Sequence, residues 1–304
     1  MTQQENIKEL PYGVSDFLTV ANENLYFVDK SMYIPKLEKE GRNLFFIRPR
    51  RFGKSIFVSM LHAYYDCKTT PEQFQKWFGG LWIGQHPTPL QGKFMVLHLD
   101  FSQVGGTIDN MEKNFDEYCG AKFDYFVDYY NNVYSEDFIK KVHDAKDANM
   151  KLTLINLETD RQRLSLYLII DEYDNFTNTI LNEKGEEVYH AITHANGFYR
   201  DVFKKFKGNF ARIFMTGVSP VTLDDVTSGF NIGWHISTKR AFNQMLGFSE
   251  DDVRNLIQYL KREGELPEEC DTERMIKDMK PWYDNYCFSE SALTTQSKVF
   301  NCDM

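Results

Sequence analysis

Four short apolar runs divide the chain, and each ends in small or charged residues. They cover residues 44–47, 94–99, 166–170 and 210–215. Apolar residues recur at helical spacing between the runs, over 55–65, 107–134, 136–163 and 183–207, and the stretch 71–83 is amphipathic and aromatic. Short buried strands alternating with helices are typical of a parallel sheet covered by helices. The pattern therefore predicts an α/β protein.

The loop after the first run carries the strongest chemical signal. A strand, a basic loop and Gly-Lys-Ser opening a helix form a phosphate-binding loop, in which glycine allows close approach of the backbone, lysine contacts the outer phosphates and serine binds magnesium. The first glycine of the usual pattern is replaced by Arg48. The predicted nucleotide-binding residues are Arg48, Pro49, Arg50, Arg51, Phe52, Gly53, Lys54, Ser55 and Ile56.

The third run ends in two adjacent carboxylates, Asp171 and Glu172. A buried strand of this kind delivers an aspartate to a magnesium ion, and the following glutamate can polarise an attacking water. The alternative is an ordinary core strand followed by a solvated acidic turn. That alternative leaves the upstream basic loop unexplained, so we expect Ser55 and Asp171 to hold magnesium, with Lys54 and Glu172 as catalytic residues.

The fourth run ends in Thr216-Gly217-Val218-Ser219-Pro220. In a P-loop ATPase this position suits a group that senses the γ-phosphate, and both Thr216 and Ser219 offer a hydroxyl. The alternative is a plain turn closed by Gly217 and Pro220. The sequence favours the sensor interpretation without separating the two hydroxyls.

Three arginines make this loop unusually positive. We expect at least one of Arg48, Arg50 and Arg51 to lie over the phosphates. Pairing with acidic residues of the C-terminal segment, or of a partner subunit, is the alternative. No arginine acting in trans can be named from the sequence.

Composition limits the other function classes. The 304 residues carry a net charge of −9, which argues against a broad nucleic-acid-coating surface. Five cysteines show no regular spacing, and no apolar run reaches the roughly 20 residues of a membrane helix. The aromatic residues of 107–134 are expected in the core, because only two lysines accompany them. We expect a soluble, cytoplasmic protein with reduced thiols.

The chain changes character near residue 238. Helices are predicted over 249–263 and 271–281, the first capped by Ser249 with acids in its first turn. We predict a core over 1–238 and a small helical domain over 239–304. This second domain is expected to act as a mobile lid, entered through Lys239 and Arg240, which either reach the γ-phosphate or only solvate a connector.

With Arg-Pro-Arg-Arg-Phe-Gly-Lys-Ser, Ile-Ile-Asp-Glu-Tyr-Asp and Thr-Gly-Val-Ser-Pro in order, the chain closely resembles the bacterial AAA-ATPase-like family. The lead-in 11–17 and the late motif 282–288 fit the family too, and its members carry an arginine at the position of Arg48. The resemblance implies an additional-strand P-loop fold with helices on both faces. It also implies ATP rather than GTP as ligand. Members of the family often carry a C-terminal PD-(D/E)XK nuclease-like domain, so we expect the chain to be a fragment of a longer protein, the alternative being a lineage that lost this domain.

Two functions follow from the residues and the resemblance together. One is a magnesium-dependent ATPase that gates or remodels an attached effector, such as the nuclease-like domain. The other is a nucleotide-dependent switch with little hydrolysis that recruits nucleic acid or protein. A homo-oligomer is compatible with either function. The presence of both carboxylates favours the enzyme.

Overall fold

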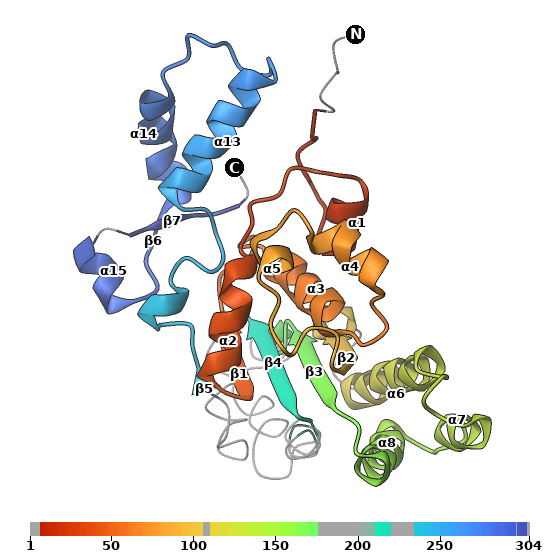
Figure 1. Cartoon of the computed structure of the whole chain (residues 1–304). Coiled ribbons are helices and arrows are strands. Elements are labelled where there is room, and N and C mark those ends of the chain that lie inside the picture. The colour runs from red at the N-terminus through yellow and green to blue at the C-terminus, as the bar shows by residue number, and fades with distance from the viewer. Residues whose placement is uncertain are drawn as a thin grey trace, which may run out of the picture.

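The computed structural model describes residues 7–105, 110–175, 203, 206, 210–219, 234–295 and 297–302, without the side chains of Asp284 and Asn285. A central sheet separates two layers of helices, and a smaller C-terminal unit lies beyond one end of the sheet (Figure 1). The predicted helix over 183–207 falls mostly outside the described residues.

The central sheet has five parallel strands in the order β2-β3-β4-β1-β5. Strand β4 pairs with both β1 and β3, so it separates the strand before the basic loop from the strand that carries Asp171. This inserted strand confirms the additional-strand P-loop fold. The strands are β1 (Asn43–Ile47), β2 (Met95–Asp100), β3 (Leu166–Asp171), β4 (Arg212–Gly217) and β5 (Trp234–His235).

Alternation along the strands builds one core on each face of the sheet. Phe45, Leu168 and Met215 contribute to the core on one face, whereas Phe46 and Phe214 contribute to the core on the other. The second face is covered by α1 (Phe17–Asn22), α2 (Ile34–Glu40), α3 (Lys54–Tyr65), α4 (Pro71–Phe78) and α5 (Trp82–Gln85). The first is covered by α6 (Met111–Tyr129), α7 (Glu136–His143) and α8 (Ala148–Gln162).

The helix predicted over 136–163 is divided into α7 and α8. Asp147 stands between them and accepts a hydrogen bond from the amide of Met150 at 2.7 Å, which caps α8. The aromatic residues of α6 lie mainly in the core, as expected, with Phe115, Phe123 and Phe126 buried. Tyr125 is the exception, with 64% of its surface exposed.

The C-terminal unit contains the two predicted helices and a short antiparallel pair of strands. The helices stand beside one another, away from the sheet (Figure 1). Tyr26, from the lead-in, packs its ring 4.7 Å from that of Tyr259. The elements are η4 (Arg240–Phe242), α13 (Glu250–Arg262), α14 (Thr272–Tyr283), β6 (Asp284–Tyr286), α15 (Glu290–Thr295) and β7 (Val299–Phe300).

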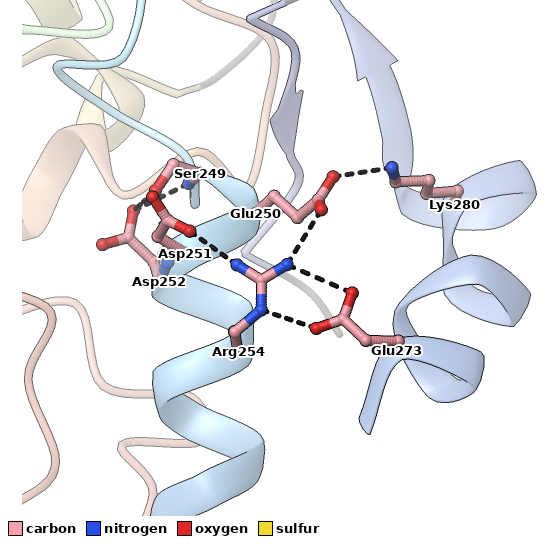
Figure 2. Close-up of polar contacts among 7 residues, drawn as sticks. All are labelled: Ser249, Glu250, Asp251, Asp252, Arg254, Glu273 and Lys280. Carbon is pink, nitrogen blue, oxygen red and sulfur yellow. Dashed lines mark hydrogen bonds and ion pairs between the residues drawn. The ribbon is translucent and has the colours of Figure 1, made fainter. Parts of the chain in front are cut away.

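A polar network joins α13 to α14 (Figure 2). Arg254 donates to Asp251 and Glu250 on its own helix, at 2.5 and 3.0 Å, and its Nε donates to Glu273 on α14 at 2.7 Å. Lys280 of α14 pairs with Glu250 at 2.6 Å. Because these groups are largely exposed, the network contributes more to the orientation of the two helices than to stability.

Asp252 stabilises the same unit from a more buried position. Its carboxylate accepts from the amide and hydroxyl of Ser249, both at 2.7 Å, and from Lys30 Nζ at 2.5 Å. Asp252→Ala is expected to lower the free energy of unfolding by about 1–2 kcal/mol, since it removes a capping box and a half-buried pair. Denaturant titration measures this, with the 87% exposed Asp251 changed to alanine as the control. An equal loss from both variants would contradict the capping role.

All five cysteines are free thiols. Within the described part of the chain, no helix has the length and apolar character needed to cross a membrane.

Candidate nucleotide-binding site

Neighbouring strands bring polar residues to one edge of the sheet. Asp100, Asp171 and Thr216 stand at or near the C-terminal ends of β2, β3 and β4, and Arg48 follows β1 directly. Side chains along a strand alternate between the two faces of the sheet. Val96, Ile169 and Phe214 belong to the core that α3 covers, and they precede Asp100, Asp171 and Thr216 by an even number of residues. The side chains of Asp100, Asp171 and Thr216 therefore lie on the same face as α3. Open α/β sheets bind ligands at this edge.

The basic loop joins β1 to α3 as predicted. Gly53 caps the helix with φ +79°, a left-handed conformation that favours glycine. Arg51 also has a positive φ, of 66°. The helix begins at Lys54, so its first amides, which have no intrahelical acceptor, face the loop. This arrangement is a ready anion site.

Lys54 is buried within the loop. Its Nζ donates to the carbonyl oxygens of Arg48 and Pro49, at 3.2 and 3.1 Å. Burial lowers the pKa of Lys54 below its usual range, against the opposing effect of the Asp171 and Glu172 carboxylates. The ammonium is thus held by two neutral oxygens, which a phosphate can replace.

The two motifs predicted to share magnesium are in direct contact. Ser55 Oγ donates to Asp171 Oδ2 at 2.6 Å. Burial raises the pKa of Asp171 to about 6, while the Ser55 bond lowers it and the charge of Asp100 raises it. Ser55 lies in the first turn of α3, and Asp171 ends β3. Such a hydroxyl and such a carboxylate are the oxygen ligands that magnesium takes beside a triphosphate.

Glu172 follows in a strained backbone conformation. Its φ is +50°, which is uncommon for a residue with a side chain, and its amide donates to Asp171 Oδ1 at 3.0 Å. Strained residues of this type concentrate at functional sites. Glu172 is half-buried, so its carboxylate remains accessible at the edge of the site.

The structure distinguishes the two hydroxyls proposed as sensors. Thr216 is buried, and its Oγ1 has no hydrogen-bond partner among the described residues. Ser219, by contrast, is fixed through its main chain, because its amide donates to Asp174 at 2.5 Å and its carbonyl accepts from Tyr173 at 2.6 Å. Thr216 is therefore the better placed candidate, and Ser219 belongs to the turn that supports it.

Gly217 allows that turn to pack closely. A Cβ at this position would lie 2.4 Å from Tyr173 Cε1 and 2.5 Å from Asp174 Oδ1. The Asp174 carboxylate also accepts from the amide of Val218 at 3.1 Å. Sequence reasoning gave Asp174 no role, although its place three residues after Asp171 marks it as part of the same turn.

Arg48 lies differently from the other loop arginines. Its guanidinium donates to the carbonyls of Ile47, Ser237 and Phe242 at 2.8, 3.0 and 2.7 Å. The group lies between the rings of Phe46 and Phe288, 4.1 and 3.8 Å from their centroids. Burial lowers its pKa to about 9, so it remains a cation at neutral pH. The side chain of Arg48 is directed into the protein, and only its backbone contributes to the loop.

The other loop residues divide between surface and core. Arg50 and Arg51 have exposed side chains, whereas Phe52 is buried and packs its ring 4.8 Å from that of Tyr286. Pro49 contributes its carbonyl to Lys54, and Ile56 lies half-buried in the first turn of α3. The expectation of an arginine over the phosphates therefore rests on Arg50 and Arg51.

Comparison with protein families decides the assignment. A family model described as a predicted AAA-ATPase matches residues 11–227, which include the loop, the Asp171 strand and Thr216. The chain belongs to the AAA-ATPase-like family. This is the family that the motifs resemble. Arg48, which replaces the usual first glycine of the loop, has a structural role through its buried hydrogen bonds.

Two known proteins are similar to this family member. An uncharacterised protein from the vnfD 5′ region of Azotobacter chroococcum mcd 1 is 22% identical over 308 residues, covering 94% of this chain and 50% of the relative. The chain thus spans about half the length of that curated relative. Among solved structures, Cdc6p from Pyrobaculum aerophilum covers 75% of this chain and 45% of its own, with 9% identity and a TM-score of 0.32.

Proposed function

We propose that this protein binds ATP with magnesium at the loop 48–56 and hydrolyses it. The observation that carries the proposal is the Ser55–Asp171 hydrogen bond, at 2.6 Å, between motifs 116 positions apart in the chain. Two P-loop motifs that meet at the C-terminal edge of a parallel sheet form one site for a nucleoside triphosphate.

The residues present suit magnesium. Ser55 and Asp171 would hold the ion, because a hydroxyl and a carboxylate are hard oxygen ligands. When bound, magnesium neutralises charge on the outer phosphates and so favours displacement at the terminal phosphorus. Within the described residues, no group of three or more histidine, cysteine or acidic side chains forms a separate metal site.

Each remaining polar residue has a role in this proposal. Lys54 exchanges the two loop carbonyls for phosphate oxygens, and the first amides of α3 bind the same anion. Glu172 accepts a proton from the attacking water. The Thr216 hydroxyl, which lacks a partner among the described residues, donates to the γ-phosphate and reports its presence. Arg50 and Arg51 offer charge at the rim of the loop.

Glu172→Gln tests the hydrolytic step. The amide cannot accept the proton of water, so turnover is expected to fall by about 10²–10³-fold while ATP affinity stays close to that of the wild type. Phosphate release and binding of a labelled ATP analogue measure the two quantities. Glu117→Gln on the exposed face of α6 is the matched control. Retained turnover in Glu172→Gln would remove Glu172 from the mechanism.

A switch with little hydrolysis remains the second candidate. The strained Glu172 and its buried neighbour Asp171 favour the enzyme, because a switch needs only the binding residues. Steady-state phosphate release with and without DNA separates the two candidates. Sustained release supports the ATPase, and a single bound nucleotide per chain without release supports the switch.

We also propose that nucleotide turnover gates an effector, such as a nuclease-like domain, through which nucleic acid is contacted. The greater length of the Azotobacter relative supports a larger assembly of this kind. Homo-oligomer formation belongs to the same proposal.

The segment 239–304 is proposed to act as a lid that follows the nucleotide. It contacts the loop backbone directly, since the amides of Gly247 and Cys302 donate to the carbonyls of Phe52 and Arg51, at 3.3 and 3.1 Å. Lys239 does not reach toward the loop but pairs with Glu40 of α2. A change in the loop on binding phosphate therefore passes to this segment through its backbone contacts.

Hydrogen exchange tests the lid. A non-hydrolysable ATP analogue is expected to slow exchange of amides in 239–263 in the wild type, because the contacts to Arg51 and Phe52 tighten when the loop is ordered. The Lys54→Ala variant serves as the control, in which the analogue has no effect. Identical protection in the two states of the wild type would contradict the lid.

A further inference from the structure

A cleft extends from the proposed magnesium ligands, away from the phosphate-binding loop. It begins at Ser55, Asp171 and Glu172, passes between α3 and β2, and ends at the rims formed by α4 and α6. Its volume is about 900 Å³, which is near the upper end of the range for small-molecule sites. Of the loop 48–56 only Ser55 lines it, so the cleft adjoins the proposed nucleotide site at its magnesium end.

The cleft is strongly acidic. Five carboxylates and two lysines line it. Asp171 and Glu172 are at the magnesium end, Asp100 is the register partner of Asp171, and Asp16 and Asp66 lie farther along the cleft. His62 and His98 also line it, and burial lowers the pKa of both, to about 4 for His98, so they add no positive charge at neutral pH.

These carboxylates are held by neutral donors. Asp66 accepts from the hydroxyls of Tyr129 and Tyr130, both at 3.0 Å, and Asp16 and Asp100 accept from hydroxyl and amide groups of nearby residues. Within the described residues, none of the three forms an ion pair with a lysine or arginine. Asp66 is buried, whereas Asp16 and Asp100 are partly exposed, so the negative charge of these two is fixed in place and available to a cationic ligand.

Aromatic side chains form the outer rim. Tyr125 and Tyr129 stack with their centroids 5.9 Å apart at an interplanar angle of 15°, and Trp77 of α4 lines the cleft opposite them. Tyr125 is 64% exposed, which is unusual in a helix whose other aromatic residues are largely buried. Aromatic faces beside carboxylates attract guanidinium and ammonium groups while packing against their methylene stems.

The floor carries one buried polar group without a partner. His98 Nε2 is inaccessible to water and makes no hydrogen bond within the described part of the chain. A neutral imidazole can pair with a main-chain amide or carbonyl. Such a group at the base of an acidic, aromatic cleft suits a ligand that brings both cations and a peptide backbone.

We propose that this cleft binds an extended basic peptide segment of a partner protein. Arginine or lysine side chains lie against Asp16 and Asp100, and their stems pack on Tyr125 and Trp77 at the rim. The negative lining disfavours a nucleic-acid strand, whose phosphates it would repel. Because the inner end reaches Glu172, an occupant also lies beside the residue proposed to activate water, and this regulatory consequence alone rests on the proposed function.

Fluorescence anisotropy with a labelled peptide of alternating arginine and leucine tests the site. Measurements are made without nucleotide, on the wild type and on Lys54→Ala, so that a failure of ATP binding does not affect the result. Tyr125→Lys removes an exposed ring and adds a repelling charge, and it is expected to weaken binding by about tenfold. Leu157→Lys on α8, at 63% exposure, is the matched control and is expected to change affinity by less than about twofold.

Asp100→Asn provides a second test that keeps the shape of the side chain and the acceptor for the Ser102 amide, with circular dichroism to verify folding. Weaker binding in both cleft variants, lower affinity at higher salt, and no binding of a glutamate–leucine peptide support the proposal. Equal effects of Tyr125→Lys and Leu157→Lys would overturn it. Tighter binding of a single-stranded oligonucleotide than of the basic peptide would assign the cleft to nucleic acid instead.

Discussion

Lys54→Ala is expected to lower the affinity for ATP by at least about 100-fold, because no other described cation is buried among the loop carbonyls. Among the described residues Lys54 Nζ donates hydrogen bonds only to the carbonyls of Arg48 and Pro49, and circular dichroism verifies that the variant folds. Titration with a fluorescent ATP analogue measures the loss. Lys146→Ala, at a 76% exposed lysine in the connection between α7 and α8, is the control. Wild-type affinity in Lys54→Ala would place the nucleotide elsewhere.

Arg48→Ala is expected to act on stability and not on charge at the phosphates. It removes a buried cation that satisfies the carbonyls of Ile47, Ser237 and Phe242, and it opens the space between two rings. Loss of one partner from a buried charged network of this kind costs about 3–5 kcal/mol. Denaturant titration measures the change in the free energy of unfolding.

Two further variants separate the causes of that loss. Arg48→Met keeps the packing volume but not the hydrogen bonds, so it should recover part of the stability. Arg50→Ala, in the same loop but exposed, should change stability by less than about 0.5 kcal/mol. If Arg48→Ala and Arg50→Ala were equally stable, the guanidinium of Arg48 would not hold the loop to the C-terminal segment.

The local chemistry of the site is predictable from the sequence because its motifs are short and contiguous. Gly53, Lys54 and Ser55 occupy the turn and the helix start that their residue types favour, and Asp171 ends a fully buried strand. Their contact follows from the rule that parallel strands deliver their C-terminal ends to one edge. Helices α13 and α14 are likewise read from local signals, among them the Ser249 cap of α13.

Features that depend on distant residues could not be predicted in the same way. The position of β4 between β1 and β3 is a matter of long-range pairing, and only the family resemblance anticipated it. Arg48 turns inward because its acceptors lie 189 and 194 positions later in the chain, beyond any local pattern. The residues that line the acidic cleft come from α1, α3, β2, α4 and α6. Because these elements are far apart in the sequence, the sequence alone could not predict that their carboxylates line one cleft.

The most direct test of the account is calorimetric titration of the wild-type protein with a non-hydrolysable ATP analogue, with magnesium and again with EDTA. One site per chain is expected, with affinity that falls by at least about tenfold without magnesium, because Ser55 and Asp171 then contact no cation. The site should be lost in Lys54→Ala and kept in Glu172→Gln. Absence of binding by the wild type, or binding unaffected by both magnesium and Lys54→Ala, would contradict the assignment of this loop as the ATP site.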